Sequence, residues 1–227
     1  MADQELVERL RQGSVVWNAW REQQSEQVFD LSGADLGGAD LSFAKLRHAD
    51  LNRTNLRSTT LSAADLRDTD LRYADLSDAD LRAANLRSAN LIHTNLGYTN
   101  LTDTDLRYAD LSDANLSAAD LRGANLQGAI VWETVFAHVD LREVKGLTEI
   151  RYKGPSRVEL YTILLPQDGS TLHFLRNVGV PDEWIGDYRA RMMHPIQYHS
   201  CFISYSNKDD SLAHRLHADL QAKGVRC

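Results

Sequence analysis

The chain has 227 residues, enough for one or two domains with a buried core. Its net charge of −7 argues against a broad nucleic-acid-binding surface, because phosphate binding draws on clustered Lys and Arg. Two cysteines make no disulfide framework, no stretch approaches the roughly 18 apolar residues of a membrane span, and the acidic N-terminus lacks an apolar signal segment. We therefore expect a soluble, cytoplasmic protein without a membrane partner.

Residues 1–27 are expected to form a helix that covers the first core residues of the next domain. Between Asp3 and Arg21 the apolar residues come close to helical spacing, although Gly13 weakens the middle of the segment. A cover is needed because the open end of a repeat structure exposes strand edges and core. A partner-binding helix is the alternative. The apolar positions are Leu6, Leu10, Val16, Trp17 and Trp20, and the two tryptophans are the expected lid.

Residues 28–142 carry a five-residue period. Leucine recurs at every fifth position from Leu31 to Leu126, twenty times in a row. A small residue lies two positions before each leucine from Leu36 on, beginning with Ala34, and Asp or Asn comes directly before the leucine in nearly all units, with Lys45 and Thr60 as departures. Three further apolar residues extend the phase to twenty-three: Val131, Phe136 and Leu141.

A period of five fits neither a helix, with its period near 3.6, nor a flat strand, with its period of 2. It fits a chain that turns a corner every five residues, so that four sides close a square coil of about twenty residues. The small residue and the leucine of each side would point inward, and successive coils would stack at roughly 4.8 Å. Stacking is what buries the leucines, because no coil can cover its own. We expect a rod on the order of 27 Å long, with Leu66, Leu86 and Leu106 in its structural core.

The repeated Ala-Asp/Asn-Leu pattern resembles the pentapeptide-repeat family over about half of the chain. The resemblance implies a mainly β fold, a right-handed quadrilateral β-helix with a leucine ladder along its axis. Some members of the family resemble duplex DNA in shape and charge and bind DNA gyrase. Residues 28–142 carry 17 acidic and 11 basic side chains, a net −6, which is modest for a DNA mimic.

Residues twenty apart should share an outer column. We expect the arginines of one such column to pair with aspartates around the corner and within the stack. Guanidinium groups about one strand spacing apart repel each other unless carboxylates lie between them. The alternative is a strip that binds an anion or an acidic partner. The arginine column is Arg47, Arg67, Arg87 and Arg107, and a neighbouring column is Asp50, Asp70, Asn90 and Asp110.

Residues 143–200 are expected to be a small α+β connecting segment, because the five-residue phase stops after Leu141. Leu147–Tyr152 and Arg157–Leu165 have strand character, Leu172–Val178 reads as a short helix, and Pro181–Trp184 reads as a helix start. The histidines of the segment lack the spacing of metal ligands: His173, His194 and His199.

Residues 201–227 read as strand, acidic loop, helix, glycine and second strand, the first unit of a parallel α/β sheet. The strand Phe202-Ile203-Ser204-Tyr205-Ser206 resembles the opening of a Toll/interleukin-1 receptor (TIR) domain. The resemblance implies a TIR domain truncated after its first β-α unit, in an arrangement similar to bacterial repeat–TIR fusions. It also implies that a partial loop borders half of a nucleotide pocket, whereas the catalytic glutamate of NAD⁺-cleaving TIR domains has no counterpart here. The loop residues are Ser204, Tyr205, Ser206 and Asp209.

No phosphate-binding, nucleophile-elbow or zinc motif occurs in the sequence. We therefore expect no catalytic residue, no cofactor and no metal. The expected function is a non-catalytic protein-interaction scaffold, a rigid rod attached to an incomplete TIR signalling module, with protein partners that include other TIR domains or a second copy. Two alternatives stay open. One is a fragment of an NAD⁺-cleaving signalling or defence enzyme whose catalytic part lies beyond residue 227, and the other is a DNA-mimic binder of gyrase.

Overall fold

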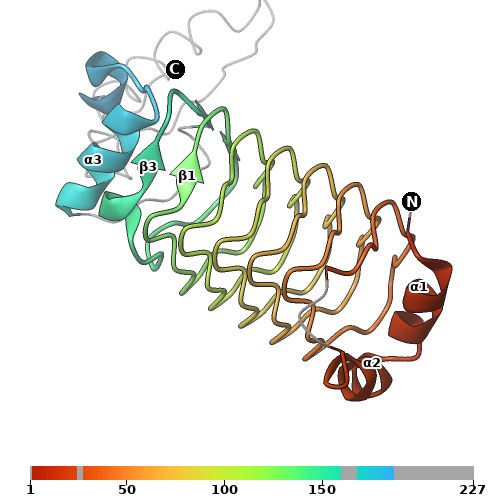
Figure 1. Cartoon of the computed structure of the whole chain (residues 1–227). Coiled ribbons are helices and arrows are strands. Elements are labelled where there is room, and N and C mark those ends of the chain that lie inside the picture. Colours follow the sequence, from red (N-terminus) through yellow and green to blue (C-terminus); the bar gives the residue numbers. More distant parts are fainter. Residues whose placement is uncertain (1, 25–27, 160–167, 187–227) are drawn as a thin grey trace, which may run out of the picture. The chain divides into compact units, whose positions relative to one another are not determined.

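The computed structural model describes residues 2–24, 28–159 and 168–186, and the chain divides into two compact units, Met1–Val180 and Pro181–Cys227. The first unit is a stack of square coils with helices α1 and α2 at one end and α3 at the other (Figure 1). In the second unit, residues 181–186 are described and the chain is helical from residue 182. The N–H groups of Trp184 and Ile185 donate to the Pro181 carbonyl, so a helix begins where the sequence predicted one.

Each five-residue unit is built on one tight turn. In the unit of Leu81, the N–H of Ala84 donates to the Leu81 carbonyl at 3.0 Å, and Ala83 between them has a φ of 54°. This combination is typical of a type II turn. Within the described part of the chain, all eighteen non-glycine residues with positive φ occupy this same position, two residues after the central apolar residue. The repeated turn forms the corner of the square.

The coils stack in parallel with a step of twenty residues. Asp40 pairs with Thr60, Thr60 with Asp80, and Asp80 with Asn100. Beside each bridge the leucine N–H donates to the next coil, as from Leu81 to the Asn100 carbonyl at 2.8 Å. Each side of the square is too short for a regular strand. The expected mainly β architecture is therefore a ladder of isolated bridges, with four two-residue strands in the described residues.

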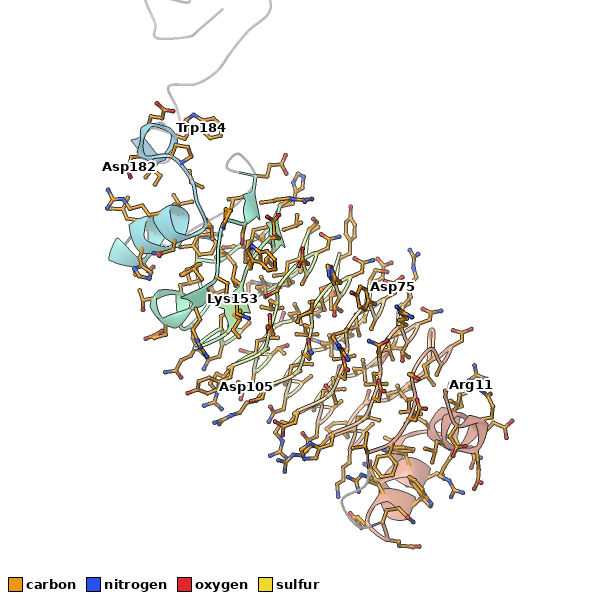
Figure 2. All side chains as sticks on the ribbon, turned by 45° about the horizontal axis from the view of Figure 1, so that its top comes forward. Arg11, Asp75, Asp105, Lys153, Asp182 and Trp184 are labelled. Atoms are coloured by element: carbon orange, nitrogen blue, oxygen red, sulfur yellow. The ribbon has the colours of Figure 1, made fainter. Side chains whose placement is uncertain are left out.

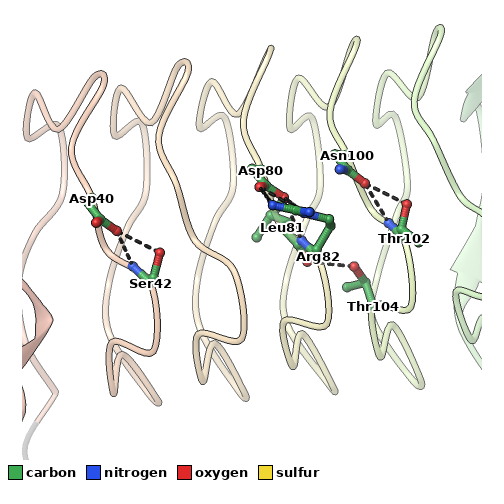
Figure 3. Close-up of polar contacts among 8 residues, drawn as sticks. All are labelled: Asp40, Ser42, Asp80, Leu81, Arg82, Asn100, Thr102 and Thr104. Carbon is green, nitrogen blue, oxygen red and sulfur yellow. Dashed lines mark hydrogen bonds and ion pairs between the residues drawn. The ribbon is translucent and has the colours of Figure 1, made fainter.

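The core is a column of leucines. Every leucine of the uninterrupted run, from Leu31 to Leu126, is at most 1% exposed, as the inward orientation predicted. The small residue two positions earlier is also buried in nearly all units. Where this residue is threonine, its hydroxyl is satisfied by a leucine carbonyl, as in the 2.9 Å bond from Thr104 Oγ1 to Leu81 (Figure 3). The interior of the rod is therefore filled.

Two short helices lie at the N-terminal end, α1 (Gln4–Arg11) and α2 (Ser14–Arg21), where the sequence predicted one. Gly13 separates them because its φ of 99° is incompatible with a continuing helix. Trp17 is fully buried, and its ring lies 5.6 Å from that of Phe29 in the first coil. Val16 was expected on the buried side but is exposed, whereas Val7 of α1 is buried.

The two helices also bind the open edge of the first coil. The Trp17 indole N–H donates to the Lys45 carbonyl at 2.9 Å. The Asn18 amide donates to the Phe43 carbonyl at 2.9 Å and accepts the Lys45 N–H at 2.8 Å. The N–H groups of Ala2 and Asp3 donate to carbonyls of the first coil at 3.0 Å. Backbone groups that have no preceding coil to pair with are thus hydrogen-bonded.

The stack continues past residue 142, where the connecting segment was expected to begin. Lys145 still pairs with Asn125. Two strands then pair in parallel with two of the preceding coil: β3 (Arg151–Tyr152) with β1 (Ile130–Val131), and β4 (Arg157–Val158) with β2 (Val135–Phe136). Ile130 pairs with Arg151 and Val135 with Arg157, so the step grows to 21 and then 22 residues. The compact unit ends at Val180 rather than at residue 142.

The extra residues of this last coil include a left-handed glycine and a short 3-10 helix, η1 (Leu147–Glu149). Gly146 has a φ of 78°, and a Cβ there would lie 2.5 Å from the backbone nitrogen of Gln127. Helix α3 (Gly169–Asn177) begins three residues before the predicted Leu172, because the Asp168 carboxylate accepts the Ser170 N–H at 2.9 Å. Its buried Phe174 packs edge-on against Phe136 at 5.4 Å.

Candidate interaction surface

The Asp or Asn before each leucine holds the turn that follows. Its side chain accepts the N–H two residues further on, as from Ser42 to Asp40 at 3.0 Å and from Thr102 to Asn100 at 3.1 Å (Figure 3). The Ser42 hydroxyl adds a second bond to Asp40, at 2.7 Å, and these two bonds hold the pKa of Asp40 below its usual value. The Asp/Asn consensus is visible in the sequence, but its role in the turn was not predicted. The tendency of Asp and Asn to bond their own backbone two residues on was the available signal.

Six outward arginines pair with the aspartate two residues before them. The Arg82 Nη2 lies 2.7 Å from the Asp80 carboxylate, with Nε bonds at 3.0 Å (Figure 3). The hydrogen bond from Arg82 is the largest cause of a lowered pKa at Asp80, against a smaller opposing effect of desolvation. The six arginines of this kind are Arg67, Arg72, Arg82, Arg107, Arg122 and Arg142.

Three arginines that directly follow a leucine lack an aspartate two residues earlier and reach the next coil instead. Lys45 precedes Arg47, which contacts Asp68 at 3.1 Å. In the same way, Arg57 follows an asparagine and contacts Asp78 at 3.1 Å. The guanidinium of Arg87 lies 5.2 Å from the centre of the Tyr108 ring. In each case the partner is 21 residues further along the chain.

The arginine column therefore has mixed partners. Bridges from Lys45 to Asp65, Asn85 and Asp105 place Arg47, Arg67, Arg87 and Arg107 at the same position in successive coils, as predicted. Two of these arginines pair within their own unit rather than around a corner. Beneath the column, Leu66, Leu86 and Leu106 are fully buried. Figure 2 shows outward side chains around the coils, Asp75 and Asp105 among them.

Charge is distributed unevenly over the four sides of the rod, which we name by their first leucine. Units centred twenty residues apart belong to one face. The Leu46 face (units of Leu46, Leu66, Leu86, Leu106 and Leu126) has five basic and three acidic side chains, a net +2. The Leu31, Leu36 and Leu41 faces, each taken over six units, carry net charges of −4, −2 and −3. One basic face therefore stands among three acidic ones.

Each face also carries one exposed aromatic residue at the left-handed corner of a unit. Tyr73 of the Leu31 face stacks on His93 at 4.8 Å, beside Arg53. Because the four aromatic residues lie on different faces, they form no continuous aromatic stripe. In the order of the Leu31, Leu36, Leu41 and Leu46 faces, they are Tyr73, Tyr98, Phe43 and Tyr108.

The described residues provide no structural arrangement for the other candidate sites. The loop residues Ser204, Tyr205, Ser206 and Asp209 lie outside the described residues. Among residues that are described, no cluster of three His, Cys, Asp or Glu side chains is arranged to hold a metal. None of the helices in residues 2–24, 28–159 and 168–186 has the length and apolar content needed to cross a bilayer.

The stacked square coils define a solenoid of the β-helix class. The family model described as pentapeptide repeats matches in eight copies, over residues 30–62, 49–87, 84–123 and 119–145, which is just over half of the chain. The chain belongs to the pentapeptide-repeat family. The matched residues end before the 201–227 segment.

Several solved structures of this family are similar to the chain. Full-length QnrB1, a plasmid-mediated fluoroquinolone resistance protein, is 16% identical, with 69% of this chain and 100% of that chain covered and a TM-score of 0.40. The protein alr5209 from Nostoc PCC 7120 is 28% identical, with coverages of 67% and 96% and a TM-score of 0.35. HetL from Nostoc sp. strain PCC 7120, involved in heterocyst differentiation regulation, is 27% identical, with coverages of 63% and 76% and a TM-score of 0.24. No curated protein matches the chain.

Proposed function

We propose that the chain is a non-catalytic protein-interaction scaffold. The observation that carries this proposal is the filled interior. The leucine column is closed to solvent, so recognition has to take place on the outer columns. The turns and ladder bonds fix the spacing of those columns, and a preorganised surface loses little entropy on binding.

The finer form of the proposal joins the rod to a TIR-like signalling module. It is supported by the sequence Phe202-Ile203-Ser204-Tyr205-Ser206 and the acidic loop that follows. In this form the protein partners include other TIR domains or a second copy of the chain. The rival is an NAD⁺-cleaving enzyme. Incubation of the purified chain with NAD⁺ is expected to leave the nucleotide intact, and turnover above that of a heat-denatured sample would contradict the scaffold proposal.

The exposed aromatic corners allow a direct test on all four faces. Benzoylphenylalanine in place of Phe43, Tyr73, Tyr98 or Tyr108 puts one photocrosslinker on each face, at positions that already hold an aromatic side chain. In cells that produce the full chain, we expect protein adducts from one or two faces and none from the others. An absence of adducts on all four faces would count against a scaffold.

A DNA mimic that binds gyrase is a second candidate function, and it is supported by the net negative charge of three faces. The basic Leu46 face argues against it, because duplex DNA presents negative charge around its whole circumference. We expect no inhibition of gyrase supercoiling at micromolar protein. Inhibition that is lost when acidic residues of the Leu31 face are neutralised would favour mimicry instead.

A further inference from the structure

We infer that the Leu46 face docks an acidic α-helix of a partner protein, an inference that rests on the proposed scaffold function. The distribution of charge favours this face. This face carries a net charge of +2, which comes from Lys45 and Arg47 of its first unit, whereas the other three faces are net negative. Lys45 is ion-paired with Glu22 at the end of α2, at 2.5 Å. An acidic partner is therefore attracted to one side of the rod and repelled by the rest, which selects both the face and the orientation of the encounter.

Arg87, in the interior of the arginine column, also favours a carboxylate-bearing partner. Within the described residues, no carboxylate forms an ion pair with Arg87; its guanidinium lies over the Tyr108 ring instead. The Tyr108 ring also packs against Gly128 of the next coil, so closely that a Cβ on Gly128 would lie 2.7 Å from the ring. The ring is thus held by packing, and Arg87 lies over it without an ion pair to any described carboxylate, although Asp105 in the next coil lies within range of its charge. A preoriented guanidinium is suited to bind a carboxylate of a partner.

The spacing of the column arginines favours a helical partner. The four arginines follow one another at about one strand spacing, roughly 4.8 Å. Carboxylates on one face of an α-helix recur about every turn, roughly 5.4 Å. Over three steps the two series differ by about 2 Å, which flexible arginine side chains can absorb. Alternate residues of an extended peptide recur at roughly 6.7 Å, and the mismatch grows to about 6 Å. The column therefore fits a helix better than an extended chain.

The test uses a fluorescent, Ala-rich 21-residue peptide with Glu along one helical face and a peptide of equal composition with Glu dispersed around the helix. Binding to the full chain is followed by anisotropy at low and physiological salt. We expect the one-faced peptide to bind more tightly and its binding to weaken with salt. Loss of one arginine contact is expected to cost roughly threefold in affinity.

The chain offers a matched pair of variants. Arg67→Gln with Arg107→Gln removes two arginines of the Leu46 face, and Arg82→Gln with Arg122→Gln removes two of the Leu41 face. All four pair with the aspartate two residues earlier, and both pairs are two coils apart. The first double variant is expected to weaken peptide binding roughly tenfold, and the second by less than twofold. Arg87→Gln alone is expected to weaken it about threefold.

Equal effects of the two double variants would overturn the inference, as would no difference between the two peptides. If a duplex DNA probe bound the Leu46 face more tightly than the one-faced peptide, and in a salt-sensitive way, the ligand of this face would be nucleic acid and not an acidic helix. If the chain self-associated in a way that depended on Arg87, the partner of this face would be a second copy of the chain. None of these results bears on the scaffold proposal. That proposal is contradicted separately, by turnover of NAD⁺.

Discussion

The partner of each outward arginine is decided by the residue two positions before it. An aspartate at that position forms an ion pair with the guanidinium within the same unit, as Asp80 does with Arg82. Asparagine or lysine there leaves the arginine to reach the next coil, as Arg57 reaches Asp78. The same aspartates also hold the turn backbone. A single position in the repeat thus controls both the turn and the surface charge pattern.

Acid should destabilise the rod through these aspartates. The pKa values of Asp80 and Asp120 are lowered chiefly by hydrogen bonds from Arg82 and Arg122. A carboxylate whose pKa is lower in the folded than in the unfolded state stabilises the fold above its unfolded pKa, near 3.9, and loses that contribution as pH falls through the folded pKa. The melting temperature should therefore drop below about pH 4. Asp80→Asn with Asp120→Asn keeps the turn acceptors and should show a smaller drop; an unchanged drop would contradict this account.

Glycine should stabilise an exposed corner and destabilise its buried neighbour. Ala83 has a φ of 54° at an exposed position, where a Cβ is unfavourable. Ala83→Gly should therefore raise stability by about 0.5–1 kcal/mol in a denaturant titration. Ala84→Gly, one residue along, removes a buried methyl group and should lower stability by about 1 kcal/mol. Two changes of the same sign would show that the corner is unstrained.

Among the elements, the last coil shows that a coil can continue the stack without the five-residue sequence period. Two inserted residues and a left-handed glycine keep β3 and β4 in the ladder although the leucine pattern has ended. The contact that fixes this path is the approach of Gly146 to the backbone of Gln127.

Gly146→Ala should accordingly cost more than the same change at Gly33. Both glycines have positive φ, 78° and 68°, so both substitutions carry similar backbone strain, about 1 kcal/mol. Only Gly146 has a close backbone neighbour, whereas a Cβ on Gly33 meets nothing within 4 Å. Overpacking should add about 1–3 kcal/mol to the loss at Gly146, measured by thermal or chemical unfolding. Equal losses would mean that the Gln127 contact is not tight.

The five-residue pattern was sufficient to predict the coil, the inward leucines and the arginine column, because each follows from counting along the chain. It could not predict the division of α1 from α2, since that depends on the backbone conformation of Gly13. The expected pairing of column arginines with aspartates within the stack holds for Arg47, which contacts Asp68, whereas the contact of Arg87 with the Tyr108 ring was not predicted. The continuation through β3 and β4 was missed because its steps of 21 and 22 residues have no period.

At the scale of the rod-forming unit, stability comes from neighbouring coils. Leu86 is fully buried in the middle of the stack, so Leu86→Ala leaves a cavity between coils and should cost about 2–5 kcal/mol. Ser88→Lys, two residues further on at an exposed corner of the same unit, should change stability by less than about 0.5 kcal/mol. A larger loss at Ser88 than at Leu86 would mean that the inward register is wrong.

The surface charge pattern also belongs to this scale, because each face is formed by units from several coils. On the Leu46 face the net charge of +2 comes from Lys45 and Arg47 of the first unit, and the three arginines of the following units are balanced by three aspartates. A scaffold of this kind requires that the spacing between coils be fixed. The distance between coils is therefore the quantity on which the account depends most.

Spin labels on one column measure that distance directly. Cysteines at Ser62 and Arg142, with the native cysteines replaced by serine, are four coils apart, roughly 19 Å between Cα atoms; Ser42 and Arg142 are five coils apart, roughly 24 Å. Double electron–electron resonance should give narrow distributions for both pairs, with the second longer by roughly 5 Å. Broad distributions, or equal distances for the two pairs, would contradict a rigid stack of twenty-residue coils.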